Sequence, residues 1–191
     1  MPSSPKISKQ LMLKTAFEML CEEGYSAINI KTLAKKIGCS TQPISRHFGS
    51  MDGLRKELLD YCIGFLESFF QIEGDTAFDI VMGISRGYIE VAFQYPNLYK
   101  YFYMSEQDGE RMSMIAQTLR LTNYNKLIER LEKEHQIGTK EAAQFVDNMT
   151  FYVHGIASYV AVDFGSYTKE EMCKRIEKAG ESFLTQAKSI N

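Results

Sequence analysis

The sequence predicts an all-α fold, with an N-terminal three-helix domain followed by a larger helical domain and about nine helices in total. Apolar residues recur at helical spacing in one segment after another. No run rich in β-branched residues alternates as a strand would, and Pro43 and Pro96 are the only prolines beyond the N-terminal tail. We place the domain boundary after residue 50, which gives domains at residues 1–50 and 51–191.

The first helices have clear local start and stop signals. Over residues 8–23, Met12, Ala16, Met19 and Leu20 form one apolar face, and Gly24 ends the helix. A second helix is predicted over residues 30–37, with Asn29 as its N-cap and Gly38 as its stop. The third runs to Phe48 from Ser40 or Thr41, and Gly49 breaks it.

The rest of the chain reads as longer helices separated by glycine and polar clusters. The fourth helix begins at Met51, ends near residues 73–75 and has one apolar stripe, formed by Leu54, Leu58, Cys62, Phe65 and Phe69. Five further helices are predicted at about residues 76–95, 97–105, 110–135, 139–164 and 168–189.

Composition excludes several classes of protein. Of the 191 residues, 45% are apolar and 24% charged, as in globular proteins with a buried core. No apolar run approaches the roughly 20 residues of a membrane span, and residues 1–9 lack the apolar core of a signal peptide. We therefore expect a cytoplasmic protein with no membrane partner. The four cysteines are too scattered for a paired-cysteine metal site, so no metal site is expected.

Charge is distributed unevenly along the chain, although the formal net charge is only −2. Residues 1–56 contain nine Lys and Arg against four Asp and Glu, a balance of +5. The remaining residues contain 13 against 20, a balance of −7. A basic segment on an acidic body indicates that one end of the chain binds a polyanion.

Residues 29–48 have the pattern of a helix-turn-helix. Two short helices need a small residue where their axes cross and a residue that tolerates positive φ at the turn, and Ala34 and Gly38 meet these needs. Three apolar residues should face inward: Leu33, Ile37 and Ile44. Any tight helical hairpin has such residues, but the outward positions of the second helix are all hydrogen-bonding types, which favours a helix that reads the DNA major groove.

Several motifs extend this pattern: Ala16, residues 22–25, residues 30–34, Ile37-Gly38, Ile44 and residues 47–50. With these motifs, residues 8–56 resemble the DNA-binding domain of the TetR family of bacterial transcriptional regulators. Residues 88–99 and 153–158 are similar to a C-terminal domain type of one branch of that family. The chain departs from these patterns in having no Trp before His154, Ser45 where a Tyr is common, and Met51 where a Lys often begins the fourth helix.

The resemblance implies a regulator that binds double-stranded DNA as a homodimer on a palindromic operator. Within the recognition helix, Thr41, Gln42 and Ser45 would contact bases, and Gln42 is the best reader because its amide can pair with adenine. Pro43 would present its ring to the groove. Phosphate contacts would come from Lys31, Thr32, Arg46 and His47. A solvated Gln42, or His47 packed on Phe48, is the simpler alternative at those positions.

The centre of the chain is rich in aromatic residues. Successive aromatics at positions 101–103 point about 100° apart on a helix, so they cannot all face one core. Tyrosines with methionines would suit a small, largely apolar effector bearing a few polar groups. The expected pocket is lined by some of Phe65, Phe69, Tyr88, Tyr103, Met112, Tyr124, Phe151 and His154. His154 can equally be a hydrogen-bonded core residue.

The last two helices are predicted to form the homodimer. Small residues every three positions permit close approach of two helices, and larger apolar residues add contact area. The predicted interface residues are Gly155, Ser158, Ala161, Ile176 and Phe183. An internal hairpin packed on its own domain would show the same pattern.

Three functions remain open from the sequence. The first is a repressor that a small-molecule ligand releases from its operator. The second is a ligand-independent DNA-binding or co-regulatory protein with a solid aromatic core. The third, an enzyme, is not expected: the chain has no glycine-rich phosphate loop, no HExxH and no nucleophile elbow, its three histidines are scattered, and it requires no cofactor.

Overall fold

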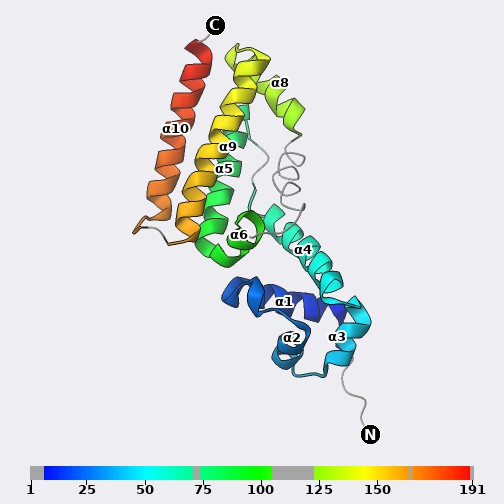
Figure 1. Ribbon diagram of the computed structural model, residues 1–191. Coiled ribbons are helices and arrows are strands. Elements are labelled where there is room, and N and C mark those ends of the chain that lie inside the picture. The colour runs from blue at the N-terminus through cyan, green and yellow to red at the C-terminus, as the bar shows by residue number, and fades with distance from the viewer. Residues whose placement is uncertain (1–6, 71–73, 105–122, 164, 190–191) are drawn as a thin grey trace. The chain divides into compact units, whose positions relative to one another are not determined.

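The computed structural model describes residues 7–70, 74–104, 123–163 and 165–189, and within these ranges it contains α-helices and turns but no strand (Figure 1). This confirms the predicted all-α fold class. The chain forms two compact units, Met1–Glu67 and Ser68–Asn191. The boundary expected after residue 50 falls between α3 and α4, whereas the first compact unit includes α4.

The N-terminal unit contains α1 (Lys9–Glu23), a 3-10 turn (Tyr25–Ala27), α2 (Ile30–Ile37), α3 (Thr41–Phe48) and α4 (Met51–Glu67). Helix α1 packs against both α2 and α4. The core is formed by fully buried side chains from every helix, including Met12, Leu20, Leu33, Ile44, Leu54 and Leu58. The ends of α1, α2 and α3 agree with the sequence prediction to within one residue.

Helix α4 is shorter than predicted, because it ends at Glu67 and leaves Phe69 outside the helix. Beyond it, the backbone of Phe69 runs close to α5. A Cβ atom added to Gly87 would lie 2.4 Å from the carbonyl oxygen of Phe69, so only glycine at position 87 permits this approach. The close backbone contact of Phe69 with α5 replaces the expected continuation of the helix.

The second unit contains α5 (Ala77–Gln94), α6 (Pro96–Tyr103), α8 (Tyr124–His135), α9 (Thr139–Ala161) and α10 (Lys169–Ser189). Helices α5, α9 and α10 pack against one another along their lengths, α8 contacts α5 and α9, and α6 packs on α5 and α9 (Figure 1). The helix predicted over residues 110–135 is described only from Tyr124, since residues 105–122 lie outside the described ranges.

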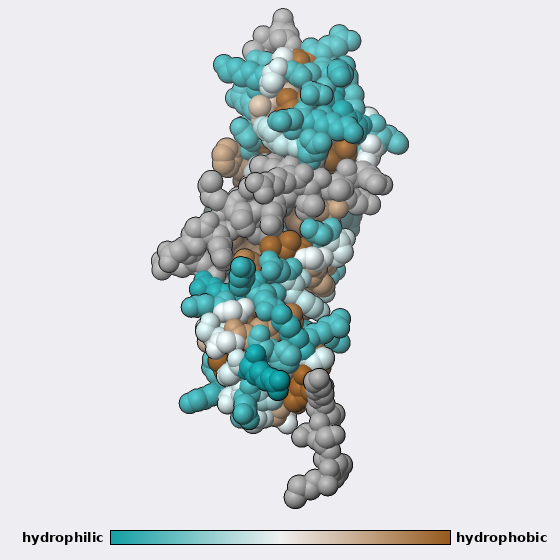
Figure 2. All heavy atoms as spheres, turned by 90° about the vertical axis from the view of Figure 1, so that its right-hand side faces the viewer, coloured by the Kyte–Doolittle hydropathy of each residue, from teal (hydrophilic) through white to brown (hydrophobic). Residues whose placement is uncertain are grey.

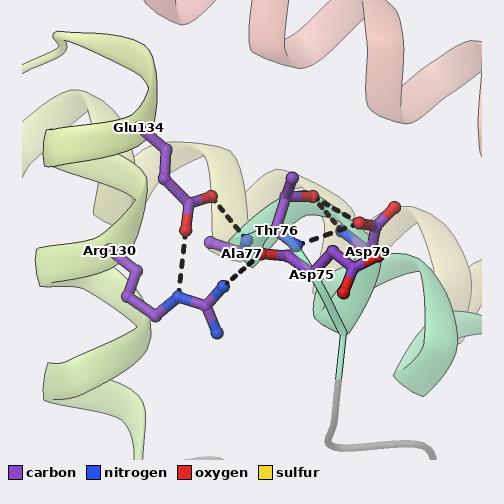
Figure 3. Close-up of polar contacts among 6 residues, drawn as sticks. All are labelled: Asp75, Thr76, Ala77, Asp79, Arg130 and Glu134. Atoms are coloured by element: carbon purple, nitrogen blue, oxygen red, sulfur yellow. Dashed lines mark hydrogen bonds and ion pairs between the residues drawn. The ribbon is translucent and has the colours of Figure 1, made fainter.

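A group of polar contacts fastens α8 to the start of α5 (Figure 3). Thr76 and Asp79 form a capping box, in which the Thr76 hydroxyl accepts from the Asp79 backbone N–H and the Asp79 carboxylate accepts from the Thr76 backbone N–H. Arg130 on α8 donates to the carbonyl of Asp75 at 2.9 Å and pairs with Glu134. These contacts fix the N-terminus of α5 on α8.

None of the described helices is both long and apolar enough to cross a membrane. Among the same residues, no three His, Cys, Asp or Glu side chains come together as a metal site would require. All four cysteines have free thiols.

Candidate functional site

Helix α2 and the turn after it are built by local signals. The Asn29 side chain accepts from the backbone N–H groups of Lys31 and Thr32, and Thr32 accepts in return from the Asn29 N–H. At the other end Gly38 has φ +80° and ψ 36°, the left-handed conformation that favours glycine. The N–H of Cys39 then bonds to the carbonyl of Ala34 at 2.9 Å, which closes the turn into α3.

Helix α3 has one buried face and one polar face. Ile44 and Phe48 are its buried residues, and Ile44 has no exposed surface. The side chains of Thr41, Gln42, Ser45, Arg46 and His47 are all exposed, while Pro43 is half-buried in the first turn. Pro43 is tolerated there because the first N–H groups of a helix have no partner within it.

The predicted phosphate-contacting residues on α2 differ in exposure. Lys31 is exposed and Thr32 is half-buried, with its hydroxyl bonded to Ala27 and Asn29 backbone oxygens. Lys35 is exposed on the same helix. Lys36 is instead paired with Glu22 and Glu23, each at 3.3 Å. The face of the N-terminal unit shown in Figure 2 is mainly hydrophilic, with hydrophobic atoms in small separate areas.

The junction between α3 and α4 is tightly packed. The Ser50 hydroxyl caps α4 by accepting from the Gly53 N–H at 3.1 Å. A Cβ atom at position 53 would lie 2.0 Å from the Phe48 carbonyl oxygen, so α4 can begin this close to α3 only with glycine there. Lys9 further ties α1 to this region through Glu57 on α4, at 2.5 Å.

Residues 12–58 match the model of the tetR family of bacterial regulatory proteins. These residues span α1 from Met12, the 3-10 turn, α2, α3 and the first half of α4. The N-terminal domain belongs to the TetR family. Its polar α3 face and glycine turn are thus those of a TetR-family DNA-binding domain, and the chain is a DNA-binding regulator of transcription. Members of the TetR family are bacterial regulatory proteins.

Solved structures of several regulators, one of them described as TetR-family, share the fold along nearly the whole chain. A transcriptional regulator from Rhodococcus sp. Rha1 matches with a TM-score of 0.65 and 17% identity over 95% of this chain and 98% of its own. A TetR-family regulator from Streptomyces coelicolor matches with a TM-score of 0.68 and 14% identity over 93% and 94%. The flavonoid-responsive regulator FrrA gives 0.54 and 17% over 93% and 95%. The comparison with curated protein sequences gave no match.

The second compact unit, Ser68–Asn191, brings three of the predicted pocket residues together. Tyr88 on α5, Tyr103 on α6 and His154 on α9 form one aromatic cluster, in which the Tyr103 ring centroid lies 5.3 Å from that of Tyr88 and 5.7 Å from that of His154. Tyr99 completes this cluster at 4.7 Å from Tyr103. We call these four residues the tyrosine–histidine cluster.

Tyr99 is a member of the cluster that was not among the predicted pocket residues. Its hydroxyl lies 3.0 Å from His154 Nδ1 and 3.2 Å from Ser158 Oγ, and it donates to the His154 carbonyl at 3.3 Å. His154 and Ser158 are four residues apart and therefore lie on one face of α9. This spacing is visible in the sequence and could have indicated that the two side chains share a hydrogen-bond partner. Burial lowers the pKa of His154.

The remaining predicted pocket residues lie elsewhere. Phe65 is on α4, where its ring packs on Phe17 at 4.6 Å. Phe69 contacts Tyr95, and Tyr124 is the half-buried first residue of α8. Phe151 is 75% exposed on α9, so its side chain lies outside the buried cluster. Met112 lies outside the described residues.

Two surface grooves in this unit are distinct from the cluster. One, of about 380 Å³, is lined by Pro96, Lys100, Asp163 and neighbouring residues. The other, of about 350 Å³, lies along α9 and includes Phe151, Gly155 and Tyr159.

The predicted dimer residues are also divided. Ala161 and Ile176 are buried within the chain, so they do not present a free surface, and Ser158 is half-buried with its hydroxyl 3.2 Å from that of Tyr99. Gly155 has open space beside it, and Phe183 packs against Tyr152 at 6.0 Å. The exposed apolar residues of α9 are instead Phe151 and Tyr159, one turn on either side of Gly155, with Tyr159 55% exposed. We call Phe151, Gly155 and Tyr159 the α9 stripe.

Proposed function

We propose that this chain is a homodimeric repressor that binds a palindromic operator and is released by a small-molecule ligand. The observation that carries the proposal is the exposed face of α3. Ile44 and Phe48 anchor the opposite face in the core, and the exposed face presents the hydrogen-bonding side chains of Thr41, Gln42, Ser45, Arg46 and His47. A helix of this kind reads base edges in the major groove, and a single one covers too few base pairs for selective binding. Two copies on a palindrome supply the missing specificity.

The α9 stripe supports the dimer. Phe151 and Tyr159 are large apolar side chains exposed on either side of a glycine, and such surfaces are commonly covered in an assembly. A second copy that places its own α9 there would bury both aromatic rings. The interface thus differs from the predicted one by using the outward residues of α9 in place of Ser158, Ala161 and Ile176.

Release by a ligand is supported by the tyrosine–histidine cluster. Hydroxyl and imidazole groups meet among aromatic rings in the second unit, and a few polar groups in a largely apolar setting are typical of small-molecule sites. One regulator with the same fold is described as flavonoid-responsive. Such a dimer would have two conformations that hold its recognition helices at different separations. A ligand can change the affinity for DNA only if it binds these two conformations with unequal affinity.

A ligand-independent regulator is the second candidate, because Tyr99, Tyr101 and Phe102 are buried and in ring contact with their neighbours. The two candidates share the DNA-binding function, so that function is tested first.

Selection of bound sequences from random double-stranded DNA tests it directly. The purified chain at moderate salt should enrich one palindromic sequence. A matched variant with Thr41, Gln42 and Ser45 all replaced by alanine should keep its helices by circular dichroism but lose the enrichment. The absence of any enriched palindrome with the natural chain would refute sequence-specific repression.

A further inference from the structure

The imidazole of His135 is a titratable group that the proposed function does not use. His135 is the last residue of α8, and its Nε2 atom is buried without a hydrogen-bond partner among the described residues. A buried polar atom of this kind is costly, so it calls for an explanation. The two other histidines differ from it, since His47 is exposed on α3 and His154 Nδ1 lies 3.0 Å from the Tyr99 hydroxyl.

The charged groups around this imidazole act in opposite directions. Lys188 in the last turn of α10 disfavours a second positive charge, while the neighbouring Glu134 and the carboxyl-terminal end of α8 favour it. Burial is the largest influence and Lys188 the next, so the pKa of His135 lies below its ordinary value of 6.5. Within the described chain, no charged group of α5 or α9, against which α8 packs, adds to this shift.

A proton on His135 would have no compensation in the buried position. The neutral imidazole has one donor and one acceptor nitrogen, whereas the imidazolium donates from both. Its Nε2–H would find no acceptor in the described part of the chain, and the charge would be repelled by the ammonium of Lys188. Such a charge becomes hydrated only when the side chain leaves the buried position.

The turn after His135 has a conformation that is unfavourable for its sequence. Gln136 has φ 55° and ψ 43°, the left-handed region that residues other than glycine seldom adopt. Ile137 follows as a buried residue, and α9 begins at Thr139. A conformation of this kind persists only where its surroundings hold it. The turn is therefore poised to open when His135 leaves its place.

The residue before His135 connects this end of α8 to α5. Glu134 bonds to the first backbone N–H of α5 and to Arg130 (Figure 3). A movement of the last turn of α8 would therefore also weaken the contact of Glu134 with α5.

We propose that His135 is an acid-sensitive latch, which fastens the end of α8 while the imidazole is neutral and releases it when the imidazole is protonated. The pKa is lowered in the folded state, so the latch contributes stability above pH 6.5, and this stability is lost as the pH falls below 6.5 through the lowered pKa. The latch goes beyond the proposed function and does not depend on DNA binding.

An NMR titration of the full chain gives the first test. With the histidine signals assigned through the backbone, the imidazole of His135 should titrate with a midpoint below 6.5. Lys188→Gln should raise this midpoint, whereas Lys178→Gln, which removes the same charge from an exposed position about 15 Å away on α10, should leave it unchanged. A midpoint of 6.5 or higher in the natural chain, or equal midpoints in the two lysine variants, would overturn the proposal.

Hydrogen exchange tests whether protonation opens this end of the unit. Between about pH 7.5 and pH 5.5, the protection factor of the Ala77 N–H should fall by at least about twofold and at most about tenfold, the largest change that one proton allows. The fall should be absent in His135→Leu, which cannot be protonated. The Thr168 N–H, bonded to Glu171 at the far end of α10, is the internal control and should keep its protection.

Protection of Ala77 that stays constant, or that falls equally in His135→Leu or at Thr168, would show that His135 does not release α8. Operator selection at neutral pH is unaffected by any of these results. A chain that selects a palindrome but keeps Ala77 protected in acid therefore refutes the latch alone.

Discussion

The carboxylate of Glu134 on α8 accepts a hydrogen bond from the backbone N–H of Ala77, the first residue of α5, at 2.6 Å. The first N–H groups of a helix have no partner within it, and a negative charge at this end also interacts favourably with the helix dipole. The other Glu134 oxygen pairs with Arg130 at 2.9 Å, so one carboxylate joins two helices (Figure 3).

Replacing Glu134 should therefore destabilise the second unit more than its position near the surface suggests. We expect Glu134→Ala to lower the free energy of unfolding by about 1–2 kcal/mol, because it leaves the Ala77 N–H and Arg130 without this acceptor. Glu134→Gln should lose less, since its amide oxygen can still accept. Urea unfolding measures the difference, with Glu129→Ala on the exposed side of α8 as the control. Equal losses in the alanine variants would contradict the role of Glu134.

The capping box of Thr76 and Asp79 predicts a pH dependence of stability. Hydrogen bonds from the Thr76 hydroxyl and backbone N–H lower the pKa of Asp79 below its ordinary value of 3.8. The pKa of Asp79 is lowered in the folded state only, so the ionised Asp79 carboxylate stabilises the fold above pH 3.8. This stabilisation is lost as the pH falls below 3.8 through the lowered pKa. The gap in unfolding free energy between the natural chain and Asp79→Asn should thus shrink from about pH 7 to about pH 3.

A second capping box gives an internal comparison for that measurement. Glu171 at the start of α10 accepts from the Thr168 backbone N–H at 2.8 Å, and its pKa is lowered by the same kind of contact. The difference in unfolding free energy between the natural chain and Glu171→Gln should also shrink as the pH falls. A gap that stays constant or widens in acid would show that the lowered pKa of Asp79 does not stabilise the fold.

The helices of the N-terminal domain could be predicted closely because their ends are encoded locally. Asn29, Gly38 and Gly49 cap or end helices through contacts within a few residues, so no knowledge of the tertiary structure is needed. The polar face of α3 followed from the same periodicity, since burial of Ile44 and Phe48 fixes which residues face outward.

The second unit was less predictable because its small residues serve contacts between segments that are distant in the sequence. Ala161 was expected at an interface but is buried within the chain. Gly180 on α10 shows the same ambiguity: a Cβ atom there would lie 2.7 Å from the methyl group of Met82 on α5. Small residues allow close helix packing, but their spacing does not say whether the second helix belongs to the same chain.

The ion pairs of Lys36 predict that the lysines of α2 contribute unequally to DNA binding. Lys35 is exposed, whereas Lys36 is held by Glu22 and Glu23. Lys35→Ala should weaken operator binding and make its salt dependence shallower, by about 0.9 in log–log slope for each phosphate that the variant no longer neutralises. Lys36→Ala should change the slope less. Binding measured over a range of salt concentrations tests this, and equal slopes for the two variants would show that the ion pairs open on DNA.

Gln42 and Lys31 should differ in the kind of binding that they support. Gln42→Ala should relax specificity at one symmetric pair of operator positions, with a loss of about 1–3 kcal/mol of base discrimination. Lys31→Ala should weaken binding to all sequences about equally, because phosphate contacts carry no base information. Binding to a set of single-base operator variants distinguishes these outcomes. A uniform loss in both variants would show that Gln42 does not read a base.

The proposed dimer through the α9 stripe predicts which substitutions would keep two copies of the chain apart. Phe151→Asp and Tyr159→Asp should each produce monomers at micromolar concentration, because a carboxylate would be buried against an apolar surface. Both residues are exposed in the single chain, so the variants should keep its helix content and melting behaviour as monomers. Sedimentation velocity reports the mass, and Asn125→Asp adds the same charge on an exposed position of α8 as the control. If the natural chain itself sediments as a monomer, or if the two variants remain dimers, the copies do not associate through this stripe.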